Sequence, residues 1–459
     1  MRKIVLLYFI IIAGAVVSRA EDLRVSMPES WPVDSISQAG IDVSWWRMFD
    51  DPLLDSLIII GESNNYDLAA AAKRIDIARS QLRSAKGAYA PTIAINAAYN
   101  RDRQSGLLYG RSGDASTMSY FNAGATMNWE IDVFGKIRAQ ARHADRYVKV
   151  SAAEYAAAMV ALDAEIAATY INLLVEKQQL KVATEHSANQ AYIVEVTEVR
   201  HNTGLVSKLD VSQARTLYYS TIASIPLLEA SIEASYNALG VLTGLGREQL
   251  PEAVFHAETM PNHYQLYGLG APIDLLRRRP DIVEAERNID LAAAELGIAK
   301  SAYLPSLTLS ASVGTAAHNI GDLFHGQSFT YSVVPTLSWT LFDGLQRRNN
   351  TLAARQSMEA QIDAYNMTVL TAIEEVANAI AHYKSSLQYI ERIANVVESS
   401  KEEVRLSMDQ YKQGLTMFSN VVDAQLNYLN YRNTLISAQG DAINSLINLY
   451  KALGGGWNE

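Results

Sequence analysis

The stretch AKGAYAPTIAINA, residues 85–97, returns almost unchanged as AKSAYLPSLTLSA at residues 299–311, which is 214 positions later. The similarity continues downstream, where TGLVSKLDVSQAR at residues 203–215 is followed by its counterpart QGLTMFSNVVDAQ at residues 413–425. A repeat of this length is not that of a solenoid, whose units are about 20 to 50 residues long. The chain is therefore predicted to be an internal two-fold duplication, with the same order of elements in each half.

The first twenty residues have the features of a signal peptide. Arg2 and Lys3 precede an apolar run from Ile4 to Val17, and Ser18-Arg19-Ala20 is typical of a cleavage site with small residues. The run is shorter than the roughly 20 residues of a membrane-spanning helix, which disfavours the alternative of an uncleaved anchor. We expect export and removal of residues 1–20.

Charge and cysteine content exclude several classes of function. The formal charge of −10 becomes −13 when the three basic residues of the signal peptide are lost, which disfavours nucleic acid as a partner. Cysteine is absent from the whole sequence, so disulfides, thiolate metal sites and cysteine nucleophiles are excluded. The eight histidines are scattered without an HExxH motif, and the GGGW near the end lacks the Lys-Ser/Thr of a phosphate-binding loop. No catalytic residue, metal site or cofactor is predicted.

Strict alternation of apolar and polar residues predicts two strands in each half, within residues 89–134 and 303–343. Each strand then has one apolar and one polar face. Two hairpins on a soluble core are the alternative, because the barrel signal is weak for any single strand. Four long strands in an exported chain favour a membrane barrel. Aromatic residues at the strand ends are the candidates for the membrane interface: Tyr89, Trp129, Tyr303 and Trp339. Pro335 removes a ladder donor from the last strand, and the sequence offers no reason for it.

Two long segments, residues 136–203 and 345–413, contain neither Gly nor Pro and are rich in good helix formers. About 68 helical residues make a rod of roughly 100 Å, which is three times the apolar thickness of a bilayer. The rods are also too charged for lipid, so they are predicted to project through an aqueous compartment. Each rod turns back at Gly204 or Gly414 to form a helical hairpin. For the rods alone, a coiled-coil spacer is the alternative.

Closure of the barrel sets the number of chains. Four strands cannot close, and an eight-stranded barrel from two chains would be filled with side chains. Three chains give twelve strands around an open lumen. The predicted fold is a mixed α and β membrane protein in which a trimeric 12-stranded β-barrel, with four strands per chain, is continued by a long α-helical barrel.

Three segments resemble the outer-membrane factors of the TolC family, in the branch paired with resistance-nodulation-division efflux pumps. They are SWWRMFDDPLLDSLI, LLRRRPDIVEAERNIDLAAAELGIAKSAYLPSLTLSASVG and DVFGK, which begin at residues 44, 275 and 132. The resemblance implies a homotrimeric duct in the outer membrane of a Gram-negative bacterium. It also implies docking on a periplasmic adaptor and an inner-membrane pump, with small molecules as cargo. A type I protein-secretion duct and a periplasmic structural spacer without a pore are the alternatives.

The resemblance also implies the domain organisation. Residues 1–20 are the signal peptide, and the β-barrel hairpins in outer-membrane lipid are 89–134 and 303–343. The equatorial segments are 21–50, 245–270 and 453–459. The helical barrel in the periplasm comprises 51–88, 135–244, 271–302 and 344–452. Many members of this branch carry a lipidated cysteine at the mature N-terminus, and the absence of cysteine predicts a protein that is not lipidated.

Site residues follow from the position of the family's periplasmic constriction, which lies at the start of the returning helix. The candidates for this aperture are Asp210, Asn420 and Asp423, and the alternative role for them is helix-start electrostatics with Ser207 as a cap. The candidates for contact with the adaptor lie in the turns: Gly204, Leu205, Gly414 and Leu415. Arg279-Pro280-Asp281 is interpreted as a helix start rather than a cargo contact.

Overall fold

The computed structural model describes residues 44–105, 115–261 and 278–457. The predicted signal peptide and most of the predicted first equatorial segment lie outside the described residues. The chain divides into two compact units. Unit 1 comprises Met1–Ala72, Ala153–Glu284 and Tyr365–Glu459, and unit 2 comprises Lys73–Ala152 and Ala285–Ala364. Each unit therefore takes chain from both halves of the sequence.

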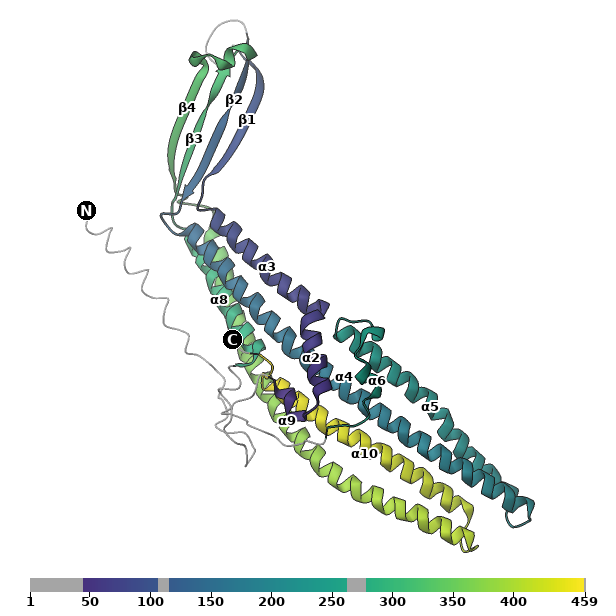
Figure 1. Cartoon of the computed structure of the whole chain (residues 1–459). Helices are drawn as coiled ribbons and strands as arrows, with labels where there is room; N and C mark the ends of the chain where they lie inside the picture. Colours follow the sequence, from purple (N-terminus) through teal and green to yellow (C-terminus); the bar gives the residue numbers. More distant parts are fainter. Residues whose placement is uncertain (1–43, 106–114, 262–277, 458–459) are drawn as a thin grey trace. The chain divides into compact units, whose positions relative to one another are not determined.

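Unit 2 contains one four-stranded antiparallel sheet in the order β1-β2-β3-β4 (Figure 1). The strands are β1 Thr92–Gln104, β2 Ser116–Ile131, β3 Ser306–Ala317 and β4 Phe329–Ser338. Two 3-10 turns, η3 Ile320–Phe324 and η4 Gly326–Ser328, connect β3 to β4. The four predicted strands are confirmed. The alternation of the last strand continues to Leu341, but β4 ends at Ser338. It ends there because Ser338 pairs with Ser306, the first residue of β3.

The two faces of the sheet differ as the alternation predicts. On one face, polar side chains bond across the strands: Asn96 donates to Thr126 Oγ1 at 2.9 Å, and Ser310 donates to Asn128 Oδ1 at 2.8 Å. The opposite face presents exposed apolar side chains, of which Ile95 is 87% exposed. Cross-strand side-chain bonds of this kind stabilise the pairing register of the strands. They involve only the polar face, so the apolar face is free to contact an apolar environment.

Pro335 lies opposite Leu309 in the ladder between β3 and β4. β4 is an edge of this four-stranded sheet. Edge strands are where a sheet tolerates proline, because one side of the strand has no partner within the sheet. Within the sheet of one chain, the position of β4 is therefore compatible with proline.

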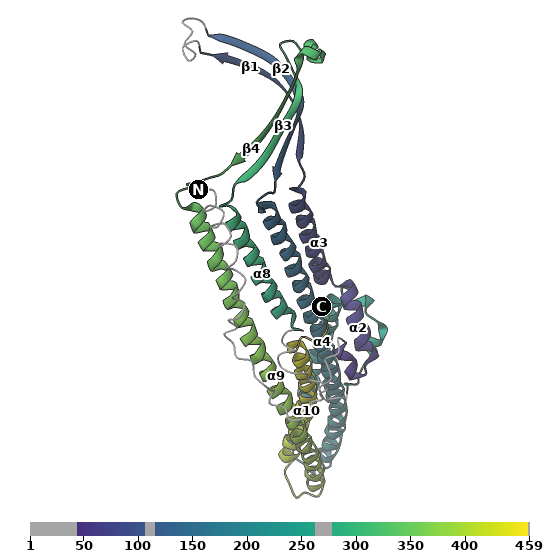
Figure 2. The same ribbon diagram turned by 90° about the vertical axis from the view of Figure 1, so that its left-hand side faces the viewer.

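The helical segments of unit 2 come from α3 (Tyr66–Gly87), α4 (Lys136–Asn202), α8 (Pro280–Ser301) and α9 (Gln346–Lys412), and they run side by side (Figure 2). Two tryptophans attach the strand ends to the turns that follow α3 and α8. Trp129 Nε1 donates to the carbonyl of Tyr89 at 2.9 Å, and Trp339 Nε1 donates to that of Tyr303 at 3.1 Å.

Unit 1 contains the rest of α4 and α9 and the helices that return from them, α5 (Lys208–Leu242) and α10 (Phe418–Ala452) (Figure 1). The two rods have 67 residues each and the two returning helices 35 each, so the predicted helical hairpins are confirmed. Gly204 and Gly414 have φ of 78° and 76°, in the left-handed region where glycine is preferred. A backbone bond back to the helix closes each turn, from Leu205 to Arg200 at 2.8 Å and from Leu415 to Gln410 at 2.9 Å.

The main apolar core also lies in unit 1. The 3-10 helix η1 (Trp45–Phe49) and helix α2 (Pro52–Asn64) pack there against α4 and α10, with Trp45 stacked on Tyr450 at 5.7 Å between ring centroids. The short helices η2 (Arg247–Gln249) and α6 (Glu252–His256) follow α5. Within the described chain, α4 has a window apolar enough to cross a membrane, but 56% of that window is buried. More than half of this window thus packs inside the protein.

Candidate functional site

The tips of the two helical hairpins pack against each other within unit 1. Their shared apolar cluster contains Ala214, Tyr411, Phe418 and Val421. The turn residues lie outside this cluster, since Leu205 is 69% exposed and Leu415 is 73% exposed. Two of the residues predicted to contact an adaptor, both leucines, are thus exposed to solvent at the turns.

Asp210 is held by both hairpins. Its backbone N–H donates to Ser207 Oγ at 3.3 Å, and the Ser207 hydroxyl donates to Asp210 Oδ1 at 2.7 Å, so the predicted cap is present. Its other oxygen accepts a 3.1 Å bond from the Tyr411 hydroxyl on α9. Burial, the negative charge of Asp210 and the hydrogen bond between the two side chains together raise the pKa of Tyr411 to about 12. Asp210 is therefore a link between hairpins.

Asp423 has a different environment from Asp210. It lies on α10 in an exposed position and makes no hydrogen bond or ion pair with any residue that the structure describes. Asn420, one turn earlier, is also exposed and donates to Thr416 Oγ1 at 2.6 Å. Because Phe418 and Val421 are buried, Asn420 and Asp423 share the opposite face of the helix. Of the aperture candidates, Asp423 alone is a free exposed carboxylate in the described structure.

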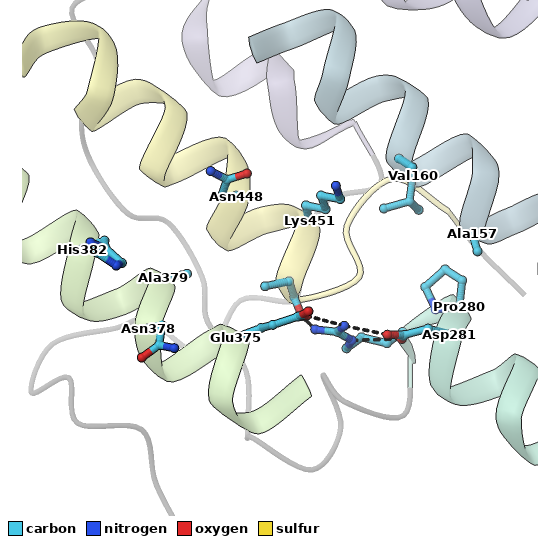
Figure 3. Close-up of a pocket in the computed structure, with 13 residues that line it drawn as sticks. Ala157, Val160, Pro280, Asp281, Glu375, Asn378, Ala379, His382, Asn448 and Lys451 are labelled. Atoms are coloured by element: carbon cyan, nitrogen blue, oxygen red, sulfur yellow. Dashed lines mark hydrogen bonds and ion pairs between the residues drawn. The ribbon is translucent and has the colours of Figure 1, made fainter. Parts of the chain in front are cut away.

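A second candidate site is the joint where α10 ends and α8 begins. Pro280 is the first residue of α8, so the predicted helix start is confirmed. Arg279 is buried there and lies between two carboxylates, at 2.6 Å from Asp281 and 2.6 Å from Glu375 of α9 (Figure 3). Its Nη1 donates to the carbonyl of Ala452, the last residue of α10, at 2.6 Å. One side chain thus ties α8, α9 and α10 together.

The charge of Arg279 is retained despite burial. Burial by itself lowers the pKa of the guanidinium, but the hydrogen bonds and negative charges of Asp281 and Glu375 outweigh it and raise the pKa above its ordinary value. A pocket of about 530 Å³ opens beside this group, with His382, Asn448 and polar residues of α9 and α10 along its wall (Figure 3).

The first half of the chain contains the counterpart of this joint. Asn65, which is 214 positions before Arg279, donates from Nδ2 to the carbonyl of Leu242 at 2.9 Å, and Leu242 ends α5 as Ala452 ends α10. A left-handed glycine follows in both copies, Gly244 with φ 68° and Gly454 with φ 73°. The internal repeat was the signal in the sequence that could have revealed the joint. The donors Asn65 and Arg279 are 214 positions apart, and the acceptors Leu242 and Ala452 are 210 positions apart.

Sequence reasoning missed Asp163, which lies in the apolar run VALDAEIAATYINLL of α4. It is fully buried, and neither of its oxygens has a hydrogen-bond partner among the described residues. Burial, with a smaller contribution from the negative charge of Glu62, raises the pKa of this carboxyl to about 8. An acid within a mostly apolar run was the available signal, although the neighbouring exposed Glu165 shows that burial could not be inferred from it.

Comparison with known structures defines the class of protein. The outer-membrane channel OprN superposes with a TM-score of 0.85 at 27% sequence identity, over 94% of this chain and 98% of that chain. The Campylobacter jejuni CmeC outer membrane channel shares the fold, with a TM-score of 0.83 at 22% identity over 94% of this chain and 93% of that chain. The fold is that of an outer-membrane channel.

Sequence comparison defines the family. The model of the family described as outer membrane efflux protein matches residues 61–245 and 271–455, and the chain belongs to this family. The solvent efflux pump outer membrane protein SrpC of Pseudomonas putida is 30% identical over 416 residues, 90% of this chain and 87% of the relative. The pyoverdine export outer membrane protein OpmQ of Pseudomonas putida is 29% identical over 448 residues, 95% of this chain and 93% of the relative. The protein is an efflux channel of the Gram-negative outer membrane that extends into the periplasm.

Proposed function

We propose that three copies of the chain form the exit duct of a tripartite efflux system. The observation that carries this proposal is the four-stranded sheet, in which β1 and β4 have no partner on their outer sides among the residues that the structure describes. Three sheets joined edge to edge close a 12-stranded barrel, with the polar faces toward the lumen and the apolar faces toward lipid. This arrangement explains why one face of the sheet is polar and the other is apolar and exposed.

The internal duplication extends this symmetry to the helices. The paired rods and returning helices have equal lengths, and the two joints repeat the same contacts, which supports an origin by duplication. Two hairpins from each of three chains give six similar units around one channel. We place residues 51–88, 135–244, 271–302 and 344–452 in this helical barrel.

The partners of the duct are a periplasmic adaptor and an inner-membrane pump. The names of SrpC and other relatives, which refer to efflux pumps for solvents, toluene and antibiotics, support this assignment and favour small molecules over proteins as cargo. The exposed tip residues Leu205 and Leu415, with Gly204 and Gly414, form the adaptor contact. We assign the chain no enzymatic activity and no cofactor.

The four aromatic residues at the strand ends mark the membrane interface. Each tryptophan donates to the backbone carbonyl of its paired tyrosine, which supports placing both residues of a pair at this interface: Trp129 with Tyr89, and Trp339 with Tyr303. Tryptophan and tyrosine are enriched at this level because one end of each side chain is apolar and the other is polar. The sheet between them and the loops is the membrane-spanning part.

The duct is tested on purified full-length protein in detergent and in planar bilayers. We expect light scattering to give three chains per particle, and we expect the reconstituted protein to conduct ions. A stable monomer without conductance would contradict the proposal. In cells, deletion of the gene should increase sensitivity to organic solvents, dyes or antibiotics, and a plasmid copy should restore resistance.

A further inference from the structure

A small pocket of about 240 Å³ lies in unit 2, between the end of β4 and the start of α9. Its wall combines aromatic, aliphatic and basic side chains, among them Tyr303, Trp339, Leu341, Phe342, Arg347 and Arg348. The apolar members are open to solvent, since Leu341 is 77% exposed and Phe342 is 81% exposed. Large apolar side chains in such a cluster indicate contact with an apolar medium or a partner.

The two arginines differ in how they are paired. Arg347 Nε lies 2.6 Å from Asp343 Oδ2, and its guanidinium lies 5.3 Å from the centre of the Tyr303 ring. Arg348 is exposed and forms no ion pair with another described residue. Arg347 and Asp343 neutralise each other, so the pocket keeps one positive charge without a partner.

The first half of the chain provides an internal comparison at the end of β2. There Lys136 pairs with Glu130 at 3.0 Å, and Asp132 accepts the backbone N–H groups of Ile137 and Arg138 at 3.0 and 2.9 Å. The two acidic and two basic side chains cancel. When the copies are aligned on Gly135 and Gly344, the second copy has Trp339 in place of Glu130 and Arg348 in place of Ala139. The excess positive charge thus belongs to the second copy alone.

We propose that this pocket binds the headgroup of an anionic phospholipid in the leaflet of the outer membrane that faces the periplasm. The proposal rests on the placement of Trp339 and Tyr303 at the membrane interface. Arg348 pairs with the phosphate, Trp339 lies at the headgroup level, and Leu341 and Phe342 contact the first carbons of the acyl chains. The exposed apolar residues favour a lipid over free phosphate, because inorganic phosphate gives them no apolar partner.

The test compares Arg348→Gln with Arg138→Gln, the nearest exposed arginine of the first copy. Each full-length protein in mild detergent is incubated with phosphatidylglycerol or phosphatidylcholine, and the bound lipid is counted by native mass spectrometry. We expect the parent protein to retain phosphatidylglycerol in preference to phosphatidylcholine. One basic residue near a lipid surface contributes about 1 kcal/mol, so Arg348→Gln should weaken retention about fivefold. Arg138→Gln should retain as much as the parent.

Three results would overturn the lipid site. They are equal retention by Arg348→Gln and the parent, equal retention of the two lipids, and displacement of phosphatidylglycerol by millimolar inorganic phosphate. The same preparations are assayed for chain number and conductance. If these are normal while lipid retention is unselective, the lipid site alone is wrong. If the protein is a monomer without conductance, the proposed duct is wrong as well.

Discussion

Arg279 donates a 2.6 Å hydrogen bond from Nη1 to the carbonyl oxygen of Ala452, and so joins the start of α8 to the end of α10. The equivalent bond in the first copy comes from the neutral amide of Asn65. The two joints have the same geometry but a different charge, because only Arg279 also pairs with Asp281 and Glu375. The second joint alone therefore depends on electrostatics.

Replacement of Arg279 should lower the stability of unit 1. Arg279→Gln leaves the carbonyl of Ala452 without its donor and separates two carboxylates from their cation. Asp281 and Glu375 are half exposed, so water compensates for part of the loss, and we expect a cost of about 1 to 3 kcal/mol. Thermal unfolding in detergent, followed by circular dichroism, measures it.

The neighbouring Arg278 is the matched control for this substitution. Arg278 is exposed. Its backbone carbonyl accepts a 2.7 Å hydrogen bond from Trp457 Nε1, and its side chain forms no bond with a described residue. Arg278→Gln should change stability by no more than about 0.5 kcal/mol. Equal melting temperatures for the parent and Arg279→Gln would show that the joint is not held by this side chain.

Asp163 should make stability depend on pH. The pKa of its carboxyl is about 8 in the folded chain and near the ordinary value of 3.8 in the unfolded chain. The folded state therefore holds a proton that the unfolded state has released across this window. Stability is lost as the pH rises from 4 to 8, by up to about 1.4 kcal/mol per pH unit for each chain. Asp163→Asn should remove most of this slope and raise the melting temperature at pH 8.

The control for Asp163 is Glu165→Gln, an exposed position on the same helix. The prediction is tested by measuring the melting temperatures of the parent, Asp163→Asn and Glu165→Gln between pH 5 and pH 9. Burial also raises the pKa of Glu62, with a contribution from Asp55, so a smaller slope of the same sign remains in Asp163→Asn. If the melting temperatures of the parent and Asp163→Asn change with pH in parallel, the Asp163 carboxyl is not the source of the pH dependence.

The elements of the fold were predictable because their signals are local. Alternation marks the strands, the absence of Gly and Pro marks the rods, and Gly204 and Gly414 mark the turns. The contacts that organise unit 1 were not predictable, since they join distant residues. Arg279 and Glu375 are 96 positions apart, and only the packing of α8 against α9 brings them together.

The candidate site was predictable only in part. The repeat and the family placed Asp210 and Asp423 near the helix starts, and Ser207 is the expected cap. Their different environments depend on which helix face meets the other hairpin. The one-dimensional pattern does not show that Tyr411, 201 positions away, bonds to Asp210.

Tyr411→Phe should loosen the link between the two hairpin tips. The change keeps the ring, which lies 5.0 Å from Phe418 and 5.2 Å from the Arg200 guanidinium, and removes only the hydroxyl that bonds to Asp210. A single hydrogen bond contributes about 0.5 to 1.5 kcal/mol, so we expect a small loss of stability and a larger open fraction in bilayer recordings. Tyr192→Phe, at an exposed position of α4, is the control. Unchanged gating in Tyr411→Phe would show that the bond does not restrain the tips.

Asp423 should control ion selectivity at the periplasmic end of the duct. If three copies of this exposed carboxylate face the channel axis, they form a ring of negative charge that attracts cations. Asp423→Asn should then reduce the preference for potassium over chloride and weaken block by trivalent cations from the periplasmic side. Asp210→Asn should have a smaller effect, because Ser207 and Tyr411 hold that carboxylate between the hairpins. Glu403→Gln, at an exposed position on α9, is the control for a simple loss of charge. Unchanged selectivity and block in an intact trimer of Asp423→Asn would place the aperture elsewhere and leave Asp423 as a helix-start charge.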